Sequence, residues 1–143
     1  MQIKDRPEFN RKGAVLTFSP DQDVFTAVQA MSEMNYGAAV IISPDRKPLG
    51  IVTERDFMRR LLSNSLDPKK TPLSAIMTSD LKLARADDDL LDWLRQMSND
   101  RFRHLPVVDG GTMVGFVSIG DLVKHRIDKI ESEAAALRDY IAS

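Results

Sequence analysis

The apolar residues of the first half alternate between a helical spacing and short β-branched runs. Val24, Ala27, Val28 and Met31 recur at the spacing of one helix face, after the helix-starting cluster SPDQD. The runs AAVII and LGIV follow, and the segment SPDRKP between them has the composition of a turn. The pattern therefore predicts an amphipathic helix, a β-hairpin and then a second helix over DFMRRLL.

The same order of elements returns in the second half. We expect a strand around LKLA, a helix from DDD through Met97, strands over HLPVV and MVGFV joined by DGG, and a helix from Ile119 onward. Residues 24–42 superpose on residues 90–108, and GIVTERD at 50–56 returns as GFVSIGD at 115–121. Such repetition indicates two copies of one structural unit.

These repeats predict the fold class and the division of the chain. Each copy reads as β-α-β-β-α, which gives an α+β (α/β) fold, and neither copy is large enough to bury a sufficient core alone. We therefore expect the two copies to pack on each other with pseudo-twofold symmetry. The predicted boundaries are residues 1–66 for the first repeat, 67–75 for a linker, and 76–143 for the second repeat with its C-terminal helix.

Composition limits the classes of partner and the cellular compartment that we expect, but it does not indicate a function. The 143 residues are 43% hydrophobic and 29% charged, with a formal net charge of −1. No strong field or long apolar run points to nucleic acid or to a membrane as a partner. The chain has no cysteine, which removes disulfides and thiolate chemistry and leads us to expect a cytoplasmic protein.

The repeated motif places a hydroxyl three residues before an aspartate, at the end of a strand and the start of a helix. The pairs are Thr53 with Asp56 and Ser118 with Asp121. One interpretation is a helix capping box, which needs no ligand. The other is a nucleotide site: the free N–H groups of a helix start favour an anion, the hydroxyl could bond phosphate, and the carboxylate could accept both ribose hydroxyls.

With these motifs, AIMT at the start of the second copy and RFRHLPVVD before its hairpin, the chain resembles a tandem pair of CBS domains, also called a Bateman module. It is most similar to stand-alone CBS-pair proteins. The resemblance implies a regulatory module that binds adenosine-containing ligands such as AMP, ADP, ATP, NAD(H) or S-adenosylmethionine in clefts between the repeats. It also implies a target enzyme or transporter that the sequence does not identify.

The resemblance carries ligand roles to particular positions. Thr53 and Ser118 would contact phosphate, and Asp56 and Asp121 would hold ribose. Backbone around 15–17 and from Thr78 to Leu81 would receive the adenine. Arg103 and His104 match a basic position of the second copy, where the first copy has Gly37 and Ala38. Because charge-assisted bonds to phosphate are strong, we expect the Ser118/Asp121 cleft to be the tighter site.

No combination of residues predicts catalysis. The only histidines, His104 and His125, have no metal-ligand spacing, and the acidic run 87–89 is typical of a helix start. Ser118 lacks the flanks of a nucleophile elbow. We expect a protein that is not an enzyme, and the alternative to ligand sensing is a constitutive structural or protein-interaction module whose twin motifs are only helix caps.

The C-terminal helix carries its own pattern. Apolar residues recur there at spacings of three and four, which is typical of a heptad seam: Ile127, Ile130, Ala134, Leu137 and Ile141. Packing on the chain's own core or N-terminal segment is one interpretation. The other interpretation, which we favour, is a homodimer interface. The resemblance to CBS-pair proteins agrees with it, since that family commonly forms disc-like dimers.

Overall fold

A computed structural model describes residues 2–3, 15–100 and 103–142, and its first half contains the predicted helix and hairpin. The order is β1 (Leu16–Phe18), α1 (Val24–Met34), β2 (Ala38–Ile42), β3 (Pro48–Thr53) and α2 (Glu54–Asp56). A π-helical stretch, η3 (Phe57–Leu62), continues α2, and a short 3₁₀ turn, η4 (Leu73–Ala75), precedes the second half. The helix expected over DFMRRLL is thus present.

The second half repeats this order, except that no strand precedes its first helix in the part of it that the structure describes. It contains α3 (Leu90–Asp100), β4 (His104–Asp109), β5 (Thr112–Ser118) and α4 (Ile119–Ala142). The turn between β4 and β5 holds Gly110 at φ 59° and Gly111 at φ 85°, a left-handed region in which glycine has no steric cost. The predicted hairpin and both predicted helices of this half are confirmed.

The prediction of a strand around LKLA is wrong. Of that segment only Ala84 pairs with a strand, through an isolated parallel bridge to Val107. Its N–H donates to the carbonyl of Pro106 at 2.9 Å, and its carbonyl accepts from the N–H of Val108 at 2.8 Å. Six residues earlier in the sequence, Thr78 pairs with Ile51 of β3. Because the segment crosses from one repeat to the other, it cannot lie along either sheet for its full length.

The formation of helix α1 follows from its capping residue and from its apolar face. Its N-cap, Asp23, accepts from the backbone N–H of Thr26 at 2.9 Å and from the Thr26 hydroxyl at 2.8 Å. These bonds hold the pKa of Asp23 below its ordinary value, because they stabilise the charged carboxylate. Val24, Ala27 and Met31 are buried on the inner face, as the apolar spacing predicts.

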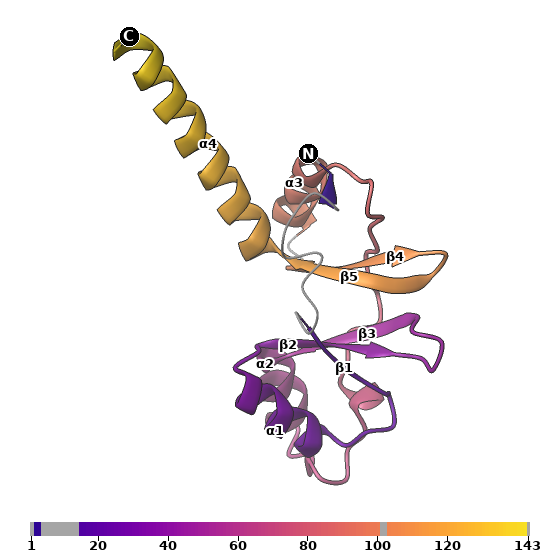
Figure 1. Cartoon of the computed structure of the whole chain (residues 1–143). Coiled ribbons are helices and arrows are strands. Elements are labelled where there is room, and N and C mark those ends of the chain that lie inside the picture. The colour runs from indigo at the N-terminus through magenta and orange to yellow at the C-terminus, as the bar shows by residue number, and fades with distance from the viewer. Residues whose placement is uncertain (1, 4–14, 101–102, 143) are drawn as a thin grey trace.

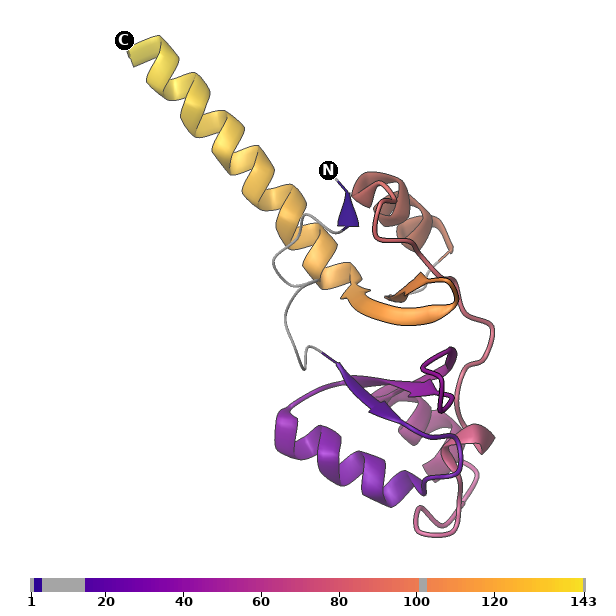
Figure 2. The same ribbon diagram turned by 45° about the vertical axis from the view of Figure 1, so that its right-hand side comes forward.

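The repeats face each other through their sheets. β2 lies between β1, which is parallel to it, and β3, which is antiparallel; β4 and β5 form a separate antiparallel pair. Figures 1 and 2 show α1 and α2 outside the first sheet and α3 beyond the β4–β5 hairpin, with the two sheets facing one another. The two repeats therefore pack on each other as the sequence predicts, with the isolated bridge of Ala84 standing where the second repeat would have its first strand.

Three clusters of buried residues make up the core. One lies within each repeat, and the third joins residues of both repeats. The buried residues of the third cluster are Val40, Ile51 and Met113, and the residues packed on them include Val15, Leu81 and Phe116. Burial of apolar side chains from both halves in one cluster holds the repeats together, and it places the end of β3 beside the second repeat.

The N-terminus belongs to the second repeat's core. Ile3 is fully buried with Leu90, Met97 and Leu105, and its N–H donates to the carbonyl of Asp88 at 3.0 Å. Nothing in the local sequence around Ile3 indicated this contact. The expected division of the chain at residues 66 and 75 stays a prediction.

Candidate functional site

The first copy of the repeated motif forms a complete capping box where β3 passes into α2. The N–H of Thr53 donates to Asp56 Oδ2 at 2.9 Å, and the N–H of Asp56 donates to Thr53 Oγ1 at 3.3 Å. The Thr53 hydroxyl also donates to Asp56 Oδ2 at 3.2 Å. The capping box that the sequence offered as one interpretation is therefore present in this copy, and it holds both side chains in position.

The same two side chains line a pocket of about 570 Å³, which is within the range of small-molecule sites. The wall from the first repeat comes from the start of β2, from β3 and from α2. The wall from the second repeat comes from the segment after η4, the end of α3 and the start of β4. The lining residues are Gly37, Ile51, Thr53, Glu54, Arg55, Asp56, Thr78, Asp80, Leu81, Lys82, Asp100, Arg103 and His104.

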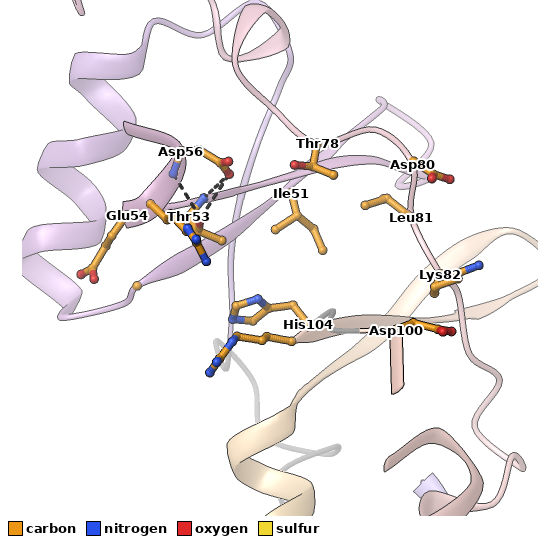
Figure 3. Close-up of a pocket in the computed structure, with 13 residues that line it drawn as sticks. Ile51, Thr53, Glu54, Asp56, Thr78, Asp80, Leu81, Lys82, Asp100 and His104 are labelled. Atoms are coloured by element: carbon orange, nitrogen blue, oxygen red, sulfur yellow. Dashed lines mark hydrogen bonds between the residues drawn. The ribbon is translucent and has the colours of Figure 1, made fainter. Parts of the chain in front are cut away.

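Figure 3 shows how this pocket is arranged. Ile51 and Leu81 lie across from His104, while Thr53 and Asp56 lie at one side and Asp80 and Lys82 at the other. The middle of the pocket is thus apolar and aromatic, and the polar groups lie around it. A ligand with a flat, apolar part and polar substituents has matching chemistry.

The His104 ring packs against a neighbouring aromatic side chain. It stacks on Phe116 with ring centroids 5.7 Å apart and an interplanar angle of 19°. The two residues lie on neighbouring strands and on the same face of the hairpin, since His104 is paired with Ser118. Stacking on Phe116 restricts the orientation of the His104 ring, which lines the pocket.

Thr78 is fixed by backbone pairing with β3. Its N–H donates to the carbonyl of Ile51, and the N–H of Ile51 donates to its carbonyl, both at 2.9 Å. The backbone N–H of Thr78 is therefore already used. A ligand contacting this stretch would meet the Thr78 side chain and the backbone from residue 79 onward.

Arg60 connects two walls of the pocket from outside it. Its Nε lies 3.6 Å from Asp56 Oδ1, and its Nη1 donates to the carbonyls of Ile76 at 3.2 Å and Met77 at 3.1 Å. One guanidinium thus links the helix that carries Asp56 to the residues immediately before Thr78. This arrangement holds the two walls in register.

The structure brings six of the eight predicted site residues into this one pocket: Thr53, Asp56, Thr78, Leu81, Arg103 and His104. Ser118 does not line it, and the side chain of Asp121 lies outside the described part of the structure. The stretch 15–17 is also absent from the lining, and Val15 packs in the cluster between the repeats. The tighter site expected at Ser118 and Asp121 stays a prediction.

Arg103 and His104 thus line the pocket of the first motif copy, whereas the sequence had associated them with the second. The repeat alignment assigned them to the second copy because they precede its second strand. Sequence reasoning also missed Asp80, Lys82 and Asp100, which line the pocket from loop and helix-end positions that carry no motif. Only the packing of one repeat on the other brings these residues together.

Within the described ranges, no group of three or more histidine, aspartate or glutamate residues could hold a metal ion. The described helices include none that is long and apolar enough to cross a membrane.

Comparison with known proteins agrees with this architecture. The model of the family described as "CBS domain" matches residues 10–63 and 73–128. The Arabidopsis thaliana "CBS domain-containing protein CBSX3, mitochondrial" is 34% identical over 133 residues, which cover 90% of this chain and 65% of that protein. This chain therefore spans just under two thirds of that relative.

Two solved structures have the same fold. A putative signal-transduction protein with CBS domains from Burkholderia ambifaria superposes with a TM-score of 0.77 at 34% identity, covering 88% of this chain and 90% of that one. The CBS domain pair of protein MJ0100, whose crystal structure is in complex with 5′-methylthioadenosine and S-adenosyl-L-methionine, superposes with a TM-score of 0.76 at 23% identity, covering 90% of this chain and 98% of that one. The chain described here belongs to the CBS domain family and carries a pair of CBS domains.

Proposed function

We propose that this CBS pair is a regulatory module that binds an adenosine-containing nucleotide between its repeats and modulates a partner protein. The observation that carries the proposal is the composition of one pocket. Thr53 and Asp56 come from the first repeat, while Thr78, Leu81, Arg103 and His104 come from the second. A ligand bound there contacts both repeats at once.

Each part of such a ligand has a complementary group. The Asp56 carboxylate can accept from ribose hydroxyls, and the Thr53 hydroxyl can donate to phosphate if it turns away from Asp56. Ile51 and Leu81 offer apolar surface to a base, and His104 offers an aromatic ring beside it. Arg103 and Arg55 are cations on the lining that could pair with phosphate. We expect AMP, ADP, ATP or NAD(H) as the ligand, and the adenosyl ligands of protein MJ0100 support the adenosine class.

Regulation would follow from the position of the site between the repeats. A ligand that contacts both repeats favours the arrangement in which both walls are in place, and the shift equals its difference in affinity for the two arrangements. A partner that recognises one arrangement would then respond to the ligand. We expect that partner to be an enzyme or a transporter, and we expect the module to act in the cytoplasm without catalysis of its own.

The alternative is a constitutive structural or protein-interaction module with no nucleotide. The complete capping box favours it, because both motif side chains already have partners within the helix start. The two functions predict different responses to nucleotide.

Thermal unfolding tests the proposal. Wild-type protein, freed of carried-over nucleotide, is heated with AMP, ADP, ATP, NAD, NADH or S-adenosylmethionine. A ligand at about 100 times its Kd adds about 2.7 kcal/mol to the free energy of unfolding, which raises the Tm by several degrees. Asp56→Asn should remove most of this rise.

Asp23→Asn is the matched control, because Asp23 is also a carboxylate that caps a helix but does not line the pocket. Both variants should lower the Tm of the ligand-free protein, and only Asp56→Asn should abolish the ligand response. If no nucleotide raises the Tm of the wild type, the constitutive alternative is correct.

A further inference from the structure

Helix α4 leaves the body of the molecule and presents an apolar stripe along its length. Both views show most of the helix projecting away from the sheets (Figures 1 and 2). The stripe residues are exposed, from 42% for Val123 to 74% for Ile141. The large apolar members of the stripe are Val123, Ile127, Ile130, Leu137 and Ile141. So many large exposed apolar side chains on one helix indicate a surface that is covered by a partner.

The spacing of this stripe is that of a coiled coil. Ile127, Ala134 and Ile141 occupy the a positions of successive heptads, and Ile130 and Leu137 occupy the d positions. A seam of this kind packs against another helix of the same pattern. A second copy of the same chain supplies such a helix.

The charged residues beside the seam specify its direction. Arg126 and Glu133 lie at g positions, and Glu131 and Arg138 lie at e positions. In a parallel, in-register pair, each g residue lies across from the e residue of the partner's next heptad. Arg126 then faces Glu131 of the second copy, and Glu133 faces Arg138 of the second copy, so every such contact joins opposite charges.

An antiparallel pair with full overlap of the seam gives the opposite result. In that arrangement g residues face g residues and e residues face e residues, so Glu131 and Glu133 would each lie across from its own copy. Like charges in these positions destabilise the pair. In the part of the chain that the structure describes, the four flanking charges form no salt bridge, so they remain available to a second copy.

We propose that two copies of this chain associate through α4 as a parallel, in-register coiled coil. The bodies of the two molecules then lie at the same end of the coil. This inference adds direction and register to the homodimer expected from the sequence, and it does not depend on nucleotide binding.

Cysteine cross-linking tests the direction, and the cysteine-free chain is a clean background for it. Ile141 lies opposite its own copy only in the parallel arrangement. Oxidised Ile141→Cys protein should therefore run as a covalent dimer, whereas Asp139→Cys, on the outer face of the helix, should stay a monomer on a non-reducing gel. As a second sample, Val123→Cys protein is mixed with Ile141→Cys protein. If a covalent dimer forms only in this mixture, the pair is antiparallel and the proposal is overturned.

Sedimentation over a range of concentrations tests the seam and its charges. Wild type should be a dimer, and Leu137→Asp should shift it to monomer at concentrations at least tenfold above the wild-type Kd. Arg138→Glu should weaken the dimer several-fold, and the added change Glu133→Arg should restore it. A wild type that is monomeric throughout, or a dimer that Leu137→Asp leaves intact, contradicts the proposal.

Discussion

The carboxylate of Asp56 uses its two oxygens differently. Oδ2 accepts from the N–H and the hydroxyl of Thr53, while Oδ1 lies 3.6 Å from Nε of Arg60. Each carboxylate oxygen has two lone-pair directions, so the two donors from Thr53 fill those of Oδ2, whereas Oδ1 keeps room for a further donor from a ligand. Capping and ligand binding are therefore compatible at this residue, and the cap holds the carboxylate ready at the pocket wall.

Arg103 is expected to act on the phosphate of the ligand. Because it is exposed, screening places its contribution at the low end of a charge-assisted bond, about 1.5 kcal/mol. Arg103→Ala should weaken AMP binding roughly tenfold and leave adenosine binding unchanged, as measured by calorimetry. Lys82→Ala, on the pocket lining but away from Thr53 and Asp56, is the matched comparison. A loss of AMP affinity in Lys82→Ala alone would place the phosphate at the other end of the pocket.

Gly50 is needed because Met77 packs directly on the strand. A Cβ at position 50 would lie 2.5 Å from Met77 Sδ and 2.8 Å from its Cγ. Gly50→Ala should lower the free energy of unfolding by about 1–3 kcal/mol in urea titration, because the overpacked side chain must move. Gly37→Ala, whose Cβ would lie 3.5 Å from the nearest atom of Glu54, should be nearly neutral.

The neighbour responsible can be identified in a double variant. In a Met77→Ala background the Sδ and Cγ atoms are absent, so Gly50→Ala should cost much less than in wild type. Equal costs in the two backgrounds would show that Met77 is not the cause.

At the scale of elements, Arg60 joins η3 to the segment before Thr78. Its two bonds to carbonyls and its contact with Asp56 hold the two pocket walls together. Arg60→Ala should lower the free energy of unfolding by about 1–2 kcal/mol and weaken nucleotide binding several-fold, because the two walls are then held together less firmly. Arg59→Ala, one residue earlier and also exposed, is the control and should change neither quantity.

Stability and binding are measured on the same samples by urea titration and calorimetry. Arg60→Lys separates the two contributions, since lysine keeps the charge near Asp56 but lacks the planar fork that reaches both carbonyls. Unchanged binding in Arg60→Ala would show that the pocket walls are held without this contact.

How far the sequence predicts each element depends on whether its signal is local. The 3.6-residue spacing over 24–31 and the turn composition between β2 and β3 are local, and both elements are where the pattern places them. The pattern over LKLA is also local, but that segment connects two sheets and makes only one strand bridge. Lys82 and Asp100 join the site through packing between repeats, which no spacing along the chain reveals.

At the scale of the whole molecule, the proposed ligand site and the contact between repeats share two residues, Ile51 and Leu81. Ile51 is buried in the cluster between the repeats and also lines the pocket. A ligand that packs on Ile51 therefore acts at the contact that sets the relative position of the repeats. Substitutions in that cluster should alter affinity even where they do not touch the ligand.

A substitution near the N-terminus tests whether the two repeats depend on each other for stability. Ile3 is fully buried in the core of the second repeat, although β1, the next described element, belongs to the sheet of the first. Ile3→Ala should therefore lower the free energy of unfolding by about 2 kcal/mol or more, whereas a change near a chain end is commonly neutral. Urea unfolding followed by circular dichroism measures it.

Leu62→Ala is the control for Ile3→Ala, since Leu62 is 65% exposed and should change the free energy of unfolding by less than about 0.5 kcal/mol. If Ile3→Ala is equally neutral, the N-terminal residues do not contribute to the core in solution. If it destabilises as expected, the second repeat draws part of its core from residues that precede the first. The stability of the second repeat then depends on a segment that lies before β1 in the chain, which couples the two repeats.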